Sequence, residues 1–147
     1  MFKKILVPTD GSAFSNQAVT TAARLAQSLG AKLLVLHVRS PLESPHHVEG
    51  GALSSLGGNA VMREIEDEER KLLDAALALA AADGTTAETA FIAGYSPSDA
   101  IIRIAREQGC DLIVMASHGR RGITGLLLGS ETQKVLSRTA IPVMIVR

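Results

Sequence analysis

Five short apolar segments, separated by longer stretches with helical periodicity, constrain the fold of this chain more than any other feature. Most are continuous runs of large aliphatic side chains rather than alternations of apolar and polar residues. Strands of a parallel sheet that are buried on both faces have this pattern, whereas a strand with one solvated face alternates. Pro142 opens the last segment, as an edge strand allows. The expected strands are residues 5–7, 33–38, 86–93, 111–115 and 143–146.

The intervals between these strands each carry a helical pattern. Asp10 or Ser12 can cap the first helix, and Gly30 is a natural stop for it. Ser96, Pro97 and Asp99 predict the start of the third helix, with Asp99 as the reciprocal partner of the Ser96 cap. Three of the expected helices follow Ser12, Asn59 and Ser96 and extend to residues 29, 82 and 108, and the fourth begins near Ser130 and extends to residue 138.

This strand–helix alternation predicts an α/β fold. We expect a Rossmann-like open sheet of five parallel strands with helices on both faces. The length of 147 residues suits a single domain, residues 1–147. Residues 39–58 are rich in glycine, proline and serine, and we expect a flexible loop insertion there. Ligands of such sheets bind beyond the carboxyl ends of the strands, where the strand order reverses, and the first and fourth strands should flank that point.

The loop after the fourth strand is rich in glycine, hydroxyls and arginine. Glycine lets the backbone approach a ligand closely, and a helix N-terminus offers unpaired N–H groups and partial positive charge. Residues 115–122 followed by Gly129 therefore suggest a phosphate cradle, and Ser130 with Gln133 matches a capping box. The residues alone leave a second interpretation open, in which these glycines only form turns and Ser130 is an ordinary cap.

Composition excludes several classes of function. Lysine plus arginine number 15 and aspartate plus glutamate number 15, so no net charge attracts nucleic acid or an anionic membrane. The single cysteine, Cys110, cannot form an internal disulfide. No apolar run is long enough for a signal peptide or a membrane span, so we expect a cytoplasmic protein. A P-loop, a dinucleotide fingerprint after the first strand and a hydrolase nucleophile elbow are all missing from the sequence.

The chain resembles the universal stress protein family. That family's nucleotide-binding motif reads Gly, two residues, Gly, nine residues, Gly, then Ser or Thr. Here Ala116, Gly119, Gly129 and Ser130 stand at these positions, with alanine in place of the first glycine. Alanine adds a methyl group where the family's backbone approaches ribose or phosphate. The resemblance extends over residues 5–12, 36–38 and 141–146, and so runs nearly the whole length of the chain.

The resemblance implies an adenine nucleotide site, with ATP as the expected ligand and Mg²⁺ accompanying it. Asp10, at the end of the first strand, would lie near nucleotide and metal, although its alternative role is helix capping. Val38 would pack against adenine, and the Ser130 hydroxyl and N–H would meet phosphate. The full candidate set is Pro8, Thr9, Asp10, Val38, Met115, Ala116, Ser117, His118, Gly119, Arg120, Gly129, Ser130, Glu131 and Thr132, with Asp10 as the metal ligand.

The function that the resemblance implies is an ATP-binding regulatory or stress-response module with slow hydrolysis at most, because no convincing general base is evident. A homodimer through the apolar edge of residues 142–146 and an unidentified protein partner are also expected. The first alternative is a nucleotide-independent, homodimeric interaction module of the same fold, which Ala116 favours and Gly129 with Ser130 disfavours. The second is an enzyme, either an ATPase or a phosphoryl-accepting receiver domain. The receiver is disfavoured because Ala93 and Gly94, not an acid, follow the third strand.

Overall fold

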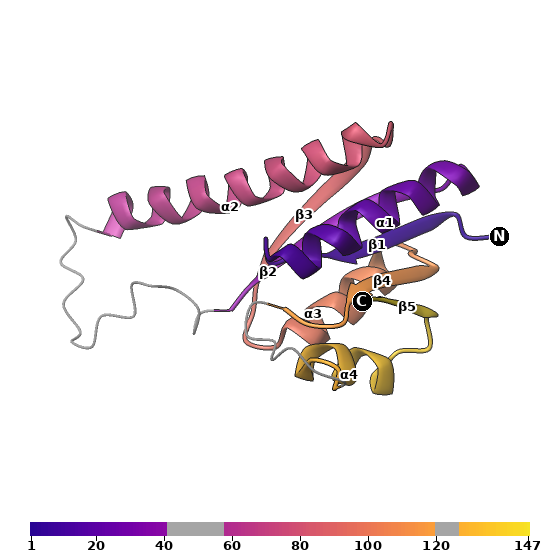
Figure 1. Cartoon of the computed structure of the whole chain (residues 1–147). Helices are drawn as coiled ribbons and strands as arrows, with labels where there is room; N and C mark the ends of the chain where they lie inside the picture. The colour runs from indigo at the N-terminus through magenta and orange to yellow at the C-terminus, as the bar shows by residue number, and fades with distance from the viewer. Residues whose placement is uncertain (41–57, 120–126) are drawn as a thin grey trace.

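A computed structural model describes residues 1–40, 58–119 and 127–147 (Figure 1). The expected flexible loop of residues 39–58 therefore lies outside the described residues apart from its ends, and so does the candidate site residue Arg120.

The order of helices and strands confirms the predicted alternation. Boundaries differ from those expected by one or two residues at most elements. The elements are β1 (Lys4–Pro8), α1 (Ala13–Leu29), β2 (Lys32–Arg39), α2 (Gly58–Ala82), β3 (Ala87–Ala93), α3 (Pro97–Glu107), β4 (Leu112–Ala116), α4 (Ser130–Arg138) and β5 (Val143–Val146).

The five strands form one parallel sheet in the order β3-β2-β1-β4-β5. The central strand β1 pairs with β2 on one side, through Ile5 and Leu33, and with β4 on the other, through Ile5 and Leu112. The strand order reverses at β1, as expected. The carboxyl ends of β1 and β4 therefore meet at the point where sheets of this class bind ligands.

The helices cover both faces of the sheet, which explains why its strands do not alternate. In Figure 1, α1 and α2 lie on one side and α3 and α4 on the other. Successive strand residues enter different cores. The core beneath α1 and α2 includes Ile5, Val7, Leu33, Val35, Val114, Ala22 and Ala76, all nearly or fully buried. The core beneath α3 and α4 includes Leu6, Leu34, Leu36, Ile113, Ile101, Ala105 and Val135.

Two helix starts follow the sequence signals. Ser12 caps α1, where its Oγ accepts a hydrogen bond of 3.2 Å from the Ser15 N–H. Gly30 ends that helix at φ 64°, a left-handed conformation that favours glycine. Ser96 caps α3 and Pro97 is its first residue, but the Asp99 carboxylate pairs with Arg138 at 2.8 Å. The expectation that Asp99 reciprocates the Ser96 cap was therefore wrong.

Candidate functional site

The turn after β1 holds the Asp10 carboxylate at the carboxyl edge of the sheet. The Thr9 N–H donates to the Leu36 carbonyl at 2.8 Å, which continues the β1–β2 pairing. The buried Thr9 hydroxyl lies 3.1 Å from the Ser15 hydroxyl and accepts from the Gly11 N–H at 3.2 Å. Asp10 Oδ1 accepts from the Ser12 N–H at 2.9 Å. Backbone and side-chain bonds thus determine where this carboxylate lies.

The start of α4 is fastened to the end of β4. The Gly129 N–H donates to the Ser117 carbonyl at 2.7 Å, and the Ser117 N–H donates to the Val146 carbonyl at 2.8 Å. The buried Thr132 hydroxyl donates to the Ala116 carbonyl at 3.1 Å. These three bonds aim the N-terminus of α4 at the same edge of the sheet as the end of β4.

Gly119, in the loop after β4, lies close to the Asp10 turn that follows β1. A Cβ atom placed on Gly119 would lie 2.7 Å from Asp10 Oδ2, closer than real Cβ contacts allow. A Cβ atom on Gly129 would lie 3.2 Å from the Ser117 carbonyl oxygen. Both glycines are therefore positions where a side chain would press on the site, and the Asp10 carboxylate faces the glycine loop.

The predicted capping box at the start of α4 was wrong. Gly129 is the N-cap, Ser130 is already the first helical residue, and no side chain makes a cap hydrogen bond. The Gln133 side chain instead donates to the Leu128 carbonyl at 2.6 Å. The reason is tertiary, since Gly129, whose N–H donates to the Ser117 carbonyl, is the N-cap and lies one residue before the serine. Unlike α1 and α3, α4 presents its first N–H groups with no side-chain cap.

The other candidate residues near the Asp10 turn and the loop after β4 have different surroundings. Pro8 ends β1 opposite Leu36, and Val38 is a half-buried neighbour of the α3–α4 core. His118 is 9% exposed; its Nδ1 lies 3.1 Å from the Ser117 hydroxyl and its ring centroid 5.8 Å from that of Phe14. Gly119 and Ser130 are exposed.

The β4 residues Met115 and Ala116 have side chains in opposite cores. Met115 is 5% exposed within the α3–α4 core, so its side chain contributes packing there. The Ala116 side chain packs against the α1–α2 core. The methyl group that departs from the family motif thus contacts core residues.

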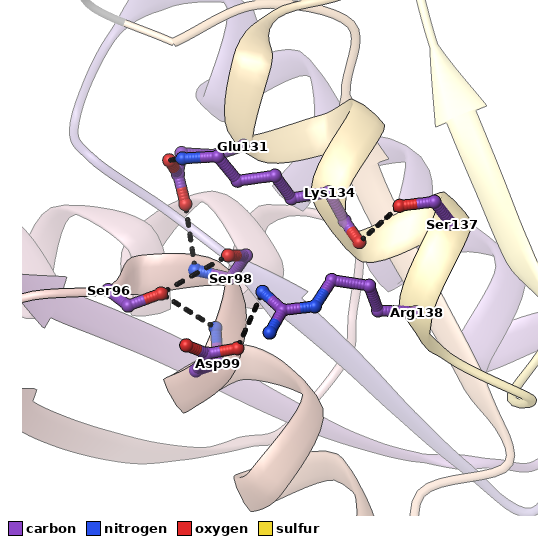
Figure 2. A network of polar contacts seen from close by, with 7 residues as sticks. All are labelled: Ser96, Ser98, Asp99, Glu131, Lys134, Ser137 and Arg138. Carbon is purple, nitrogen blue, oxygen red and sulfur yellow. Dashed lines mark hydrogen bonds and ion pairs between the residues drawn. The ribbon is translucent and has the colours of Figure 1, made fainter.

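Glu131 lies on α4 but its carboxylate faces α3 (Figure 2). One oxygen accepts from the Ser98 N–H at 2.8 Å, at the N-terminus of α3, and the other lies 2.7 Å from Lys134 Nζ. Partial burial opposes ionisation, but the Lys134 ammonium and the Ser98 N–H outweigh it and hold the pKa of Glu131 below its ordinary value. The described contacts of Glu131 therefore join two helices.

Sequence reasoning missed one buried acid near the site. Glu69 of α2 contacts His37, whose other ring nitrogen contacts the Thr9 carbonyl. Glu69 lies among the charged residues 66–71, yet its side chain is only 14% exposed. The signal was its spacing, because Glu69 follows Ile65 by four residues and precedes Leu72 by three, within the apolar stripe.

Residues 1–40, 58–119 and 127–147 contain no group of three or more His, Cys, Asp or Glu side chains arranged to hold a metal ion. Within the same residues, no helix is long and apolar enough to cross a bilayer.

Comparisons of the sequence and of the structure with known proteins indicate the same family. The profile of the Universal stress protein family matches residues 1–147. Universal stress protein YxiE of Bacillus subtilis is 36% identical over 149 residues, covering 100% of both chains. The structure of protein MJ0577 of Methanocaldococcus jannaschii is 26% identical with a TM-score of 0.79, covering 99% of this chain and 96% of that one. A universal stress protein solved in complex with cAMP is 30% identical with a TM-score of 0.72, covering 99% and 97%. The chain belongs to the universal stress protein family.

Proposed function

We propose that the crevice between the Asp10 turn and the start of α4 binds an adenine nucleotide, with ATP as the physiological ligand. The observation that carries this proposal is the start of α4, which no side chain caps and which the bond from Gly129 to Ser117 aims at the crevice. Backbone N–H groups with the helix dipole behind them favour phosphate. The family member solved with cAMP supports an adenine nucleotide in particular.

The candidate residues divide by role. Gly129 and Ser130 would meet phosphate through backbone N–H groups and the Ser130 hydroxyl, with Ser117, His118, Gly119 and Arg120 beside them. Pro8, Thr9 and Val38 would border the base and ribose. The described bonds of Thr132 and Glu131, to Ala116 and Ser98, support a role in holding α4 rather than in touching the ligand. Met115 and Ala116 would contribute the backbone of the crevice wall.

Asp10 fits Mg²⁺ that arrives with the nucleotide. Mg²⁺ keeps several waters and is commonly held by one or two carboxylates together with phosphate oxygens, so a dedicated cage of protein ligands is not required. Asp10 Oδ2 lies toward Gly119 in the glycine loop, on the side where phosphates would sit. The carboxylate would supply one oxygen and hold the metal against the phosphates.

The departure of Ala116 from the family motif is compatible with this site. Its methyl group packs against the α1–α2 core, and its carbonyl accepts from Thr132. The side chain therefore has an environment of its own within the described residues, which supports an open crevice.

The output of such a site is regulatory. No side chain among the described contacts is arranged as a general base beside Asp10, so hydrolysis would be slow at most.

We also infer a homodimer through β5, which pairs with β4 on one side and carries Met144 at 40% exposure. An unpaired apolar edge tends to associate with another strand. An unidentified protein would receive the signal.

The alternative is a nucleotide-independent homodimeric interaction module. The test is to denature freshly purified protein, identify any released nucleotide, and titrate ATP with and without Mg²⁺ by calorimetry. Bound adenine nucleotide, or saturable binding that Asp10→Asn makes insensitive to Mg²⁺, supports the proposal. A protein that releases no nucleotide, binds no ATP at millimolar concentrations and remains a dimer establishes the alternative.

A further inference from the structure

A buried histidine connects α2 to the turn that carries Asp10. His37 lies on β2 and is 6% exposed. Its Nδ1 lies 2.8 Å from the Thr9 carbonyl oxygen, and its Nε2 lies 2.7 Å from Glu69 Oε2. Glu69 Oε2 is fully buried; it lies close to Nε2, but it has no partner with hydrogen-bond geometry among the described residues. One imidazole thus spans β1, β2 and α2.

The chemistry of the two partners determines where the protons are. A carbonyl oxygen only accepts, so Nδ1 carries a proton and donates it to Thr9. The second nitrogen faces a carboxylate at 2.7 Å, and a lone pair facing a carboxylate at that distance would be repulsive. A proton on either of the two facing atoms relieves that repulsion. His37 and Glu69 thus form a close contact between an imidazole on β2 and a carboxyl group on α2.

Side chains of β2 and β3 also lie near the His37 ring. The ring stacks on Phe91 of β3, with centroids 6.0 Å apart and an interplanar angle of 27°. Arg39 lies over Phe91, its guanidinium carbon 5.5 Å from the ring centroid. Of the contacts described around the His37 ring, β1 contributes the Thr9 carbonyl, β3 the Phe91 ring, and α2 the Glu69 carboxyl group.

We propose that His37 and Glu69 are positioning residues for the nucleotide site: the pair fixes the Thr9 carbonyl and so orients the Asp10 carboxylate. Thr9 is then restrained at its N–H by Leu36, at its hydroxyl by Ser15 and at its carbonyl by His37. Asp10 follows Thr9 directly, so these contacts restrain the peptide that precedes Asp10. The inference rests on the proposed function for its effect on ligand affinity, but the pair itself can be measured without ligand.

The first measurement is nitrogen-15 NMR of the histidine rings in the free protein at pH 7. We expect His37 to carry a proton on Nδ1, facing the Thr9 carbonyl, and its ring nitrogen resonances to shift in Glu69→Gln, which changes the group that faces Nε2. The amide resonances of Asp10 and Gly11 should shift in Glu69→Gln as well. The matched control is Glu68→Gln, the same substitution at the exposed neighbouring residue, which should change neither signal. His37 ring resonances that are unchanged in Glu69→Gln overturn the pair.

The second measurement is the affinity for ATP with and without Mg²⁺. Groups that orient a metal ligand typically contribute tenfold or more, so we expect Glu69→Gln to weaken Mg²⁺–ATP binding roughly tenfold and Mg²⁺-free binding less. Two results would overturn the positioning role. One is an equal loss of ATP affinity with and without Mg²⁺. The other is an unchanged affinity in a Glu69→Gln protein whose Asp10 resonances have shifted. If the wild type binds no nucleotide, the proposed function fails. The His37 ring resonances and the Asp10 and Gly11 amide resonances then still decide whether His37 and Glu69 form a pair and whether that pair restrains the turn after β1.

Discussion

Substituting Gly119 by alanine separates binding from folding at this site. The added Cβ would lie 2.7 Å from Asp10 Oδ2, and ordinary contact begins at 3.4 Å, so the carboxylate must retreat by about 0.7 Å. Asp10 Oδ1 is already 2.9 Å from the Ser12 N–H, and the same retreat strains or breaks that bond. Gly119 itself is exposed and its φ is not positive, so alanine fits the backbone.

We expect Gly119→Ala to change the affinity for Mg²⁺–ATP more than the free energy of unfolding. Losing one partly exposed hydrogen bond costs about 1 kcal/mol, and replacing glycine by alanine recovers about 0.4–1 kcal/mol through the unfolded chain, so the free energy of unfolding should change little. If Asp10 holds Mg²⁺ as proposed, a displaced carboxylate would no longer hold the metal against the phosphates. We expect Mg²⁺–ATP affinity to fall about tenfold, which corresponds to about 1.4 kcal/mol.

Calorimetric titration of ATP with Mg²⁺, together with urea denaturation, checks both numbers. The matched control is Gly94→Ala, because a Cβ atom there meets nothing within 4 Å. Gly119→Ala that binds Mg²⁺–ATP like the wild type and like Gly94→Ala would refute the reasoning that Asp10 serves the site. A loss of affinity accompanied by a loss of several kcal/mol in stability would also refute it, because the effect would then be on the fold.

Three further predictions test the surroundings of the site. Thr132→Val removes the bond to the Ala116 carbonyl, and urea denaturation should show a loss of about 1–2 kcal/mol that Thr132→Ser largely restores. Glu131 has a lowered pKa in the folded state, so its contribution is complete above the unfolded-state pKa and is lost as pH falls through the folded-state pKa. Thermal denaturation should therefore show Glu131→Gln less stable than wild type at pH 7, by about 1 kcal/mol, with the gap closing as pH falls through the lowered pKa of Glu131; a gap independent of pH contradicts the cause given. Met144→Lys should convert a β5 dimer to a monomer in sedimentation experiments, and a wild-type monomer would remove the basis for the dimer.

The fold was predictable because its signals are local and agree with one another. The run of residues 33–38 has no alternation since its neighbours enter two different cores, and Ser12 with Gly30 delimits α1 within the chain itself. The predictions failed where a partner distant in sequence intervened. Asp99 pairs with Arg138 rather than with its own helix start, and the Ser117 carbonyl makes Gly129 the cap of α4.

The site was predictable at the level of segments rather than of contacts. The end of β1 and the loop after β4 follow from strand order, and they do converge through Asp10 and Gly119. The roles of side chains on α2 and α4 did not follow. Glu131 faces Ser98 and Glu69 faces His37, and each contact depends on how helices pack across the sheet. A sequence pattern indicates that a helix face is buried but not which strand residue it meets.

The central position of β1 has a consequence for biosynthesis. β1 gains its β2 partner from residues close behind it, but its other edge pairs with β4, through Ile5 with Leu112 and Leu6 with Ile113. Domains begin to fold as they emerge, at about 5–20 residues per second, so one edge of the central strand β1 remains without its neighbour for several seconds. A nascent chain paused before β4 would present that edge to any strand nearby. We expect chaperone dependence of this protein to be greatest when translation is slowed between β3 and β4.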